Sequence, residues 1–162
     1  MNILVVDDEK NMCTVLRILL ENDGYTVHTA SSGKKALDIL CSDGSVNLVV
    51  SDLRLPDFDG IEVLKRMKGM GLDIPLVLIT AYGSIEVAVE AMKMGARDFI
   101  TKPFNKEVIR HVVKKVLHEV DSREASGTSK KMCQDGDLIF TSGAMSEIMA
   151  TVKKVGGVQT PV

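Results

Sequence analysis

Five polar residues that could do chemistry each stand where a short apolar run of the chain ends: Asp7, Asp8, Asp52, Thr80 and Lys102. The runs before them have the length of buried β-strands, and in an open parallel sheet the carboxyl ends of the strands share one edge. We therefore expect side chains that are far apart in sequence to meet there. Three carboxylates, a hydroxyl and an ammonium group in one crevice would suit a divalent cation and a phosphoryl group.

Each member of this set has an ordinary explanation when it is taken singly. Asp7 and Asp8 could cap a helix, Asp52 could begin a turn, and Lys102-Pro103 could be a surface turn with a cis bond. The joint arrangement is more specific, because crowded carboxylates repel one another and need a cation. A few oxygen ligands are typical of Mg²⁺, which favours a phosphate as co-ligand. A carboxylate beside such a metal can attack a phosphoryl donor, and the lysine and threonine would bind the phosphoryl oxygens.

The composition sets the class of protein. The chain has 162 residues, of which 45% are hydrophobic and 26% charged, and this is typical of a soluble globular protein with one domain and an appendage. A formal net charge of −2 argues against a nucleic-acid surface. No apolar run approaches the ~20 residues that span a bilayer, and the amino terminus does not read as a signal peptide. Three widely spaced cysteines, Cys13, Cys41 and Cys133, favour reduced thiols in a cytoplasmic protein.

Strands and helices are predicted to alternate through the first 120 residues. The expected strands span 2–6, 25–30, 47–51, 75–79 and 98–101. The helix-period stretches that follow them span 10–23, 33–41, 60–69, 84–94 and 105–120. Strands that are apolar almost throughout and alternate with helices indicate a parallel sheet covered on both faces. The sequence thus predicts a doubly wound α/β domain.

The last of these helices has a wide apolar face. One edge has heptad spacing and comprises Ile109, Val113, Val116 and Val120. A second edge comprises Val108, Val112 and Leu117. Two interpretations stay open: the whole face packs on the sheet, or one edge packs on the sheet while the other pairs with a second chain.

The sequence after this helix changes character. Residues 121–137 have the composition of a linker, which could extend the helix before it. Residues 138–162 contain a second apolar segment that is too short to close a core of its own.

Four motifs carry the five polar residues. They are Val6-Asp7-Asp8-Glu9, then Asp52-Leu53-Arg54-Leu55-Pro56 with Asp59-Gly60, then Ile79-Thr80-Ala81, and finally Lys102-Pro103-Phe104. In order and spacing, residues 1–120 resemble a two-component response-regulator receiver domain. This resemblance implies a flavodoxin-like, five-stranded parallel sheet of order 2-1-3-4-5 with helices on both faces.

The resemblance also implies roles for individual residues. Asp52 would accept a phosphoryl group from a cognate histidine kinase, and Thr80 and Lys102 would bind that group. The implied ligands of Mg²⁺ are Asp7, Asp8, Asp52 and the backbone carbonyl of Arg54. Phe99 falls at the position of the family's switch aromatic, where many members carry tyrosine. The domain would be regulatory rather than an enzyme, limited to its own phosphorylation and slow dephosphorylation.

Residues 138–162 carry a second resemblance, to the start of the ATPase domain in NtrC-type activators of sigma-54-dependent transcription. The sequence contains no G-x-x-x-x-G-K-[ST] phosphate loop, so this segment is interpreted as a fragment of that domain without ATPase activity. Phosphorylation would then control oligomerisation, with a homodimer formed through helices 84–94 and 105–120 and the linker. Sigma-54 RNA polymerase would be contacted only by the missing ATPase domain, and direct DNA binding by this chain is not expected.

Two other classes of function can be set against this interpretation. A Mg²⁺-dependent phosphatase would also form an aspartyl phosphate, but it would need Asp-x-Asp directly after the first strand. Here Asp57-Phe58-Asp59 follows a turn after Asp52. Sustained turnover of a phosphomonoester would favour the phosphatase. Failure to bind Mg²⁺ or a phosphate mimic would favour an inert dimerisation module.

Overall fold

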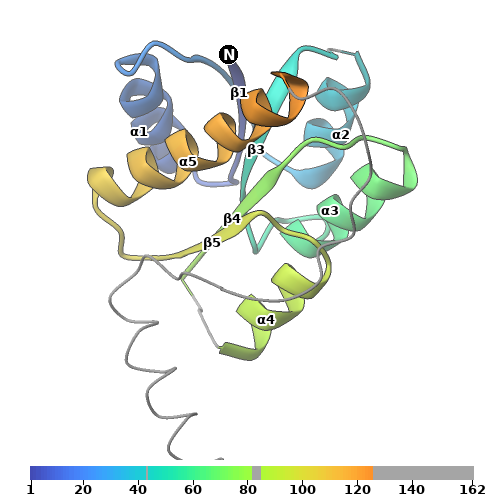
Figure 1. Ribbon diagram of the computed structural model, residues 1–162. Helices are drawn as coiled ribbons and strands as arrows, with labels where there is room; N and C mark the ends of the chain where they lie inside the picture. The colour runs from blue at the N-terminus through green and yellow to red at the C-terminus, as the bar shows by residue number, and fades with distance from the viewer. Residues whose placement is uncertain (43, 82–84, 126–162) are drawn as a thin grey trace, which may run out of the picture. The chain divides into compact units, whose positions relative to one another are not determined.

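A computed structural model describes residues 1–42, 44–81 and 85–125, in which strands and helices alternate (Figure 1). The strands are β1 (Asn2–Val6), β2 (Thr26–Ala30), β3 (Val46–Asp52), β4 (Leu76–Thr80) and β5 (Asp98–Thr101). The helices are α1 (Lys10–Glu21), α2 (Gly33–Ser42), α3 (Gly60–Gly69), α4 (Ile85–Lys93) and α5 (Lys106–Ala125). Within these ranges no helix combines the length and the apolar character that crossing a membrane requires.

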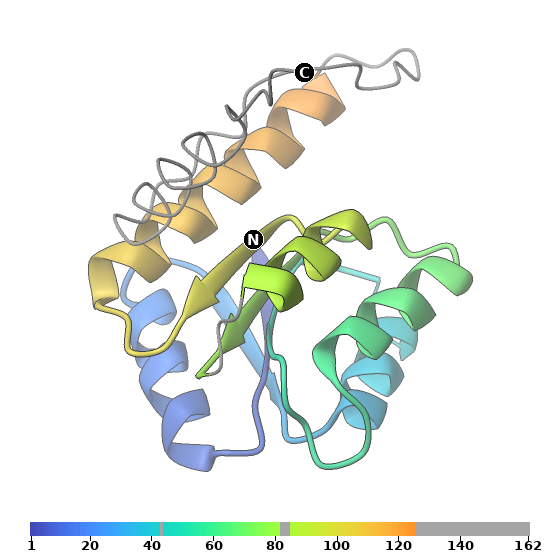
Figure 2. The same cartoon turned by 90° about the horizontal axis from the view of Figure 1, so that it is seen from below.

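The strands form one parallel sheet with the order β2-β1-β3-β4-β5. Figure 2 shows α1 and α5 together on one face and α2, α3 and α4 on the other. The predicted doubly wound α/β fold and its strand order are therefore confirmed.

Each face of the sheet has its own hydrophobic core, because successive side chains of a strand point to opposite faces. In β1, Leu4 and Val6 belong to the core under α2, α3 and α4, whereas Ile3 and Val5 belong to the core under α1 and α5. All four side chains are fully buried. Burial on both faces explains why the strands are apolar almost throughout and could be located from the sequence.

Helix α5 buries most of its two apolar edges inside the domain. Val112 and Leu117 of the second edge are 6% and 2% exposed, and they join Ile109, Val113 and Val116 in the core under α1 and α5. Most of the wide face is thus explained by packing on the sheet and on α1, while Val108 and Val120 are only partly buried. The helix runs through Ala125, beyond the predicted boundary at residue 120. The remainder of the predicted linker and the segment 138–162 lie outside the described residues.

The turn after α1 begins earlier than the sequence predicts. The helix ends at Glu21 rather than at Asp23, because the backbone N–H groups of Asp23 and Tyr25 both donate to the Leu20 carbonyl oxygen, at 3.1 and 3.2 Å. Gly24 completes this turn with φ of 90°, which favours glycine. Strand β2 begins directly after this turn, at Thr26.

Candidate functional site

The five polar residues picked out from the sequence come together at the carboxyl edge of the sheet. Asp52 and Thr80 are the last residues of β3 and β4, while Asp7 and Asp8 follow β1 and Lys102 follows β5. The backbone ladder continues past the strands, since the N–H of Lys102 donates to the Thr80 carbonyl oxygen at 2.7 Å. Residues separated by about a hundred positions in the chain are thereby held at neighbouring strand ends.

Lys102 lies at the centre of this group. Its Nζ atom is 2.5 Å from Oδ2 of Asp52 and 3.2 Å from Oδ2 of Asp7. The Lys102-Pro103 peptide is cis, as the sequence allowed. Burial alone would lower the pKa of the ammonium group, but the hydrogen bond to Asp52 and the charges of Asp7 and Asp52 outweigh it and raise the pKa. Lys102 is therefore cationic at neutral pH and binds two carboxylates at once, of which its single charge can balance only one.

Asp7 is the most enclosed carboxylate of the site, with 2% of the residue exposed. Burial raises its pKa, with a small addition from the charge of Asp52. The backbone N–H of Glu9, which donates to Asp7 Oδ1 at 2.8 Å, and the nearby Lys102 oppose this shift without cancelling it. A further cation near Asp7 would therefore favour its ionised form.

A cleft of about 280 Å³ opens beside these carboxylates. Its lining comprises Asp8, Asp52, Arg54, Leu55, Pro56, Thr80 and Ala81. The polar lining thus includes two of the predicted acidic ligands, the residue whose carbonyl is the predicted backbone ligand, and the predicted hydroxyl donor. Asp7 adjoins them through Lys102.

The donor set of the cleft fits Mg²⁺ in kind, because carboxylate and carbonyl oxygens in small number are what this ion takes. Among residues 1–42, 44–81 and 85–125, however, no three His, Cys, Asp or Glu side chains already form a closed metal cluster. Lys102 bonds one oxygen of the central carboxylate, Oδ2 of Asp52. A bound cation would share that carboxylate with Lys102.

The loop between β3 and α3 forms one wall of the cleft and is fixed at both ends. At its start, the backbone N–H of Arg54 donates to Oδ1 of Asp52 at 3.0 Å. At its end, the backbone N–H of Gly60 donates to the Leu53 carbonyl oxygen at 2.8 Å. A Cβ at Gly60 would lie 2.7 Å from the Asp52 carbonyl oxygen, so the loop can close only with glycine there.

Asp57 anchors the middle of the same loop to another helix, a role that the sequence did not suggest. Its carboxylate accepts the backbone N–H groups of Gly33 and Lys34 at the start of α2, at 2.9 and 2.7 Å. Asp59 instead caps its own helix, accepting the Glu62 N–H at 2.7 Å. Both acids of the Asp57-Phe58-Asp59 stretch are thus occupied by helix N-termini, and this argues against the phosphatase alternative.

Comparison with known proteins decides the family. Residues 3–114 match the family described as the response regulator receiver domain. The chain belongs to this family. Receiver domains are regulatory modules of two-component signalling that partner with histidine kinases, and the match points to no enzyme family.

Two curated relatives and one solved structure illustrate the similarity. The transcriptional regulatory protein ZraR of Escherichia coli (strain K12) is 36% identical over 154 residues, which are 95% of this chain and 34% of ZraR. FixJ of Bradyrhizobium diazoefficiens is 37% identical over 134 residues, which are 83% of this chain and 63% of FixJ. The beryllofluoride-activated NtrC4 receiver domain dimer superimposes with a TM-score of 0.69 at 33% identity, covering 73% of this chain and 97% of that one. This chain spans about a third of the length of the relatives it matches first.

Phe99 of this receiver domain lies in β5 opposite Leu78 of β4. Its ring is partly buried and packs against the core under α2, α3 and α4, to which Ala91 of α4 also belongs. The predicted switch aromatic therefore lies on the face of the sheet that α4 covers, three residues before Lys102. Its switching role stays a prediction.

Substitution of Lys102 by methionine in the receiver domain is expected to destabilise the Mg²⁺-free protein by about 1–3 kcal/mol at pH 7, since it leaves two crowded carboxylates without their cation. Millimolar Mg²⁺ should restore much of this loss. Urea unfolding with and without Mg²⁺ measures both effects. Lys115→Met is the matched control, because Lys115 also bonds an aspartate, Asp98, at 3.2 Å but in a more exposed place. Equal losses in both variants, or a Lys102 loss that Mg²⁺ leaves unchanged, would contradict a shared carboxylate site.

The Asp57 anchor gives a prediction that separates stability from metal binding. Hydrogen bonds from the Lys34, Gly33 and Phe58 N–H groups outweigh burial and lower the pKa of Asp57. Its contribution is therefore present above the unfolded pKa near 3.8 and is lost as the pH falls through the lower folded value. Asp57→Asn should cost about 0.5–1 kcal/mol at pH 7, because its two carboxylate oxygens accept different N–H groups and an amide keeps only one of them, and the difference should close in acid. Denaturation curves at several pH values test this.

Asp57→Asn should also weaken Mg²⁺ binding several-fold, because the loop that presents Arg54 loses its anchor. Asp59→Ala is the control: it removes a cap from α3 and should lower stability without changing Mg²⁺ affinity. Equal Mg²⁺ affinities for the two variants would show that the anchor only stabilises the fold.

Proposed function

We propose that Asp52 accepts a phosphoryl group from a cognate histidine kinase, and that the charge change at this strand end operates a switch. The observation that carries the proposal is the position of Lys102 Nζ, 2.5 Å from Asp52 and 3.2 Å from Asp7, beside a cleft that Thr80 lines. A carboxylate nucleophile, a fixed cation and a hydroxyl donor are what transfer to an aspartate requires.

The residues divide the chemistry among them. An oxygen of Asp52 attacks phosphorus as the bond from phosphorus to the donor nitrogen breaks, and the product is an aspartyl phosphate. Lys102 then moves from the Asp52 oxygen to the phosphoryl oxygens while it keeps its contact with Asp7. The Thr80 hydroxyl donates to another phosphoryl oxygen. Mg²⁺, held by Asp7, Asp8, Asp52 and the Arg54 carbonyl, would supply further positive charge to the phosphoryl group.

Mass spectrometry of the full chain tests the site of phosphorylation. With Mg²⁺ and a small acyl phosphate, the chain should gain one phosphoryl group that hydroxylamine removes, and borohydride reduction should map it to Asp52. Chelation of Mg²⁺ should prevent the gain. A label on another residue would overturn the proposal, and so would sustained hydrolysis of a phosphomonoester or a failure to bind either Mg²⁺ or beryllofluoride.

We further propose that the domain regulates an NtrC-type activator of sigma-54-dependent transcription. In support, the alignment with ZraR covers 95% of this chain and so extends well beyond the receiver match at 3–114, whereas that with FixJ covers 83%. Residues 138–162 would then start an ATPase domain, through which alone sigma-54 RNA polymerase would be contacted. A cytoplasmic location belongs to the same proposal.

Phosphorylation is proposed to act on a homodimer formed through α4, β5, α5 and the linker. The similarity to the activated NtrC4 receiver dimer supports a dimer in general. Because most of both apolar edges of α5 is buried, the most exposed apolar side chains on this side are Val89 of α4 and Met94 after it, at 45% and 37% exposed. Movement of Thr80, Lys102 and Phe99 would reach α4 through the core that Phe99 shares with it.

Val89→Asp is expected to abolish the beryllofluoride-dependent dimer while Asp52 is still phosphorylated, because it places a charge in the proposed interface. Light scattering with and without beryllofluoride measures the dimer. Val15→Asp is the matched control, since Val15 is an exposed valine, at 59%, on α1. Loss of the dimer with Val15→Asp, or its persistence with Val89→Asp, would move the interface away from α4.

A further inference from the structure

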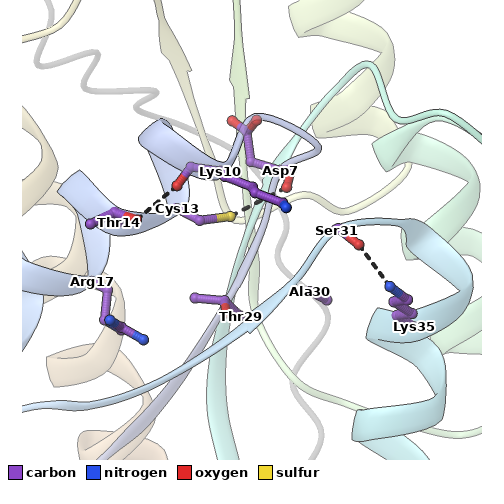
Figure 3. Close-up of a pocket in the computed structure, with 9 residues that line it drawn as sticks. All are labelled: Asp7, Lys10, Cys13, Thr14, Arg17, Thr29, Ala30, Ser31 and Lys35. Carbon is purple, nitrogen blue, oxygen red and sulfur yellow. Dashed lines mark hydrogen bonds between the residues drawn. The ribbon is translucent and has the colours of Figure 1, made fainter.

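A second cavity, of about 360 Å³, lies between the first half of α1 and the segment that joins β2 to α2. Figure 3 shows the side chains around it, and those that matter here are Lys10, Cys13, Arg17, Thr29, Ser31 and Lys35. Apart from Asp7, none of its lining residues lines or contacts the phosphorylation cleft, and the proposed function makes no use of this cavity.

Three cationic side chains surround this cavity without a matching carboxylate. In the part of the chain that the structure describes, neither Lys10 nor Lys35 has a carboxylate partner, and Lys35 Nζ bonds only the Ser31 hydroxyl, at 3.0 Å. Arg17 reaches Glu21 at no less than 4.0 Å, with both side chains half exposed. Such a long, exposed pair holds the guanidinium only weakly.

The one acidic residue of the lining, Asp7, already binds groups outside the cavity through its carboxylate. Asp7 binds the Glu9 N–H and Lys102 through its carboxylate, and Figure 3 shows that carboxylate pointing away from the three cations. What Asp7 presents toward the cavity is its backbone carbonyl oxygen, which accepts the Cys13 thiol at 3.3 Å. No carboxylate of the lining therefore neutralises the three cations, although burial and then the charges of the neighbouring Asp7 and Asp8 raise the pKa of the Cys13 thiol.

From this arrangement we propose that the cavity binds a small polyanion with two or more linked phosphate groups, such as a triphosphate chain. Arginine and lysine form charge-assisted hydrogen bonds with phosphate oxygens, and the Thr29 and Ser31 hydroxyls add neutral donors beside them. Three cations spread around one cavity match a chain of charges better than a single carboxylate. The volume is within the range of small-ligand sites, roughly 300–1,000 Å³.

Calorimetric titration of the full chain with inorganic tripolyphosphate, in Mg²⁺-free buffer of low ionic strength, tests the proposal. Saturable binding at one site is expected. Arg17→Gln and Lys35→Gln should each weaken it about 3- to 10-fold, and the double variant should bind too weakly to measure. Lys34→Gln is the matched control, because Lys34 is the exposed neighbour of Lys35 and does not line the cavity.

Two further titrations identify the kind of polyphosphate that is bound and distinguish this cavity from the phosphorylation site. If adenosine triphosphate binds as tightly as tripolyphosphate, the phosphate chain alone is recognised. If it binds more tightly, the nucleoside makes an additional contact. Both results support the proposal. Asp52→Asn should leave the binding unchanged, so this site can exist even if the phosphorylation proposal fails. The proposal is overturned if wild type shows no saturable binding, if Lys34→Gln weakens binding as much as Lys35→Gln, or if Asp52→Asn abolishes it.

Discussion

Asp52→Asn is expected to slow phosphorylation by a small acyl phosphate about 10³-fold or more, to the background of non-specific labelling. An amide is a poor nucleophile at neutral pH, whereas the rest of the site should remain in place. The amide oxygen can still accept the Arg54 N–H, which lies 3.0 Å from Oδ1 in the wild type. Initial rates at saturating Mg²⁺, followed by separation of the phosphorylated chain, measure the effect.

The control for this variant is the stability of the domain. Lys102 keeps its bond to Asp7 at 3.2 Å, and loss of one negative charge relieves Asp7, so the free energy of unfolding should change by no more than about 1 kcal/mol. Asp59→Asn, in the neighbouring loop, should phosphorylate at the wild-type rate. Phosphorylation of Asp52→Asn at a comparable rate would move the acceptor to another residue.

The sheet and the site could be predicted from the sequence for the same reason. Every strand of the sheet interior is buried on both faces, so successive residues such as Ile3, Leu4 and Val5 form continuous apolar runs whose ends can be located in the sequence. In a parallel sheet those ends meet at one edge. The sequence therefore predicts that Asp52 and Lys102 lie close together. The contact between them in the structure agrees with that argument.

What the sequence could not supply depends on contacts that have no local pattern. The Asp57 anchor joins residues 23 and 24 positions apart, and nothing near Asp57 shows that its partners are the amides of Gly33 and Lys34. The second apolar edge of α5 was open to two interpretations, because periodicity reports how wide an apolar face is and not what covers it. Packing decided the question, since Leu117 is buried in the core that includes Leu16 and Leu20 of α1.

The sequence motifs also could not predict the electrostatics of the site. The motifs identify Asp7 as an acidic residue but do not reveal that its pKa is raised by burial even with Lys102 beside it. A raised pKa means that the folded protein favours the neutral form, so the ionised carboxylate lowers stability at neutral pH. As a proposed ligand of Mg²⁺, Asp7 would therefore lower the stability of the metal-free protein while favouring metal binding.

Asp7→Asn is accordingly expected to raise the free energy of unfolding of the Mg²⁺-free protein at pH 7, because burial penalises the ionised carboxylate. The amide oxygen can still accept the Glu9 N–H, and Lys102 keeps Asp52. Because the folded pKa of Asp7 lies above the unfolded value of 3.8, the gain should be complete above the folded pKa and should vanish as the pH falls toward 3.8. Urea unfolding between pH 7 and pH 4 without Mg²⁺ measures it.

The Asp7→Asn variant should also bind Mg²⁺ more weakly. Without the Asp7 carboxylate, Mg²⁺ affinity should fall at least about 10-fold, and Mg²⁺ should no longer stabilise the protein at concentrations that stabilise the wild type. Asp98→Asn serves as control, because Asp98 is a half-exposed partner of Lys115 away from the cleft, and its Mg²⁺ response should stay that of the wild type. If Asp7→Asn is less stable than the wild type at pH 7 and still responds to Mg²⁺, then Asp7 is a structural partner of Lys102 alone, and the metal ligands must be sought among Asp8 and Asp52.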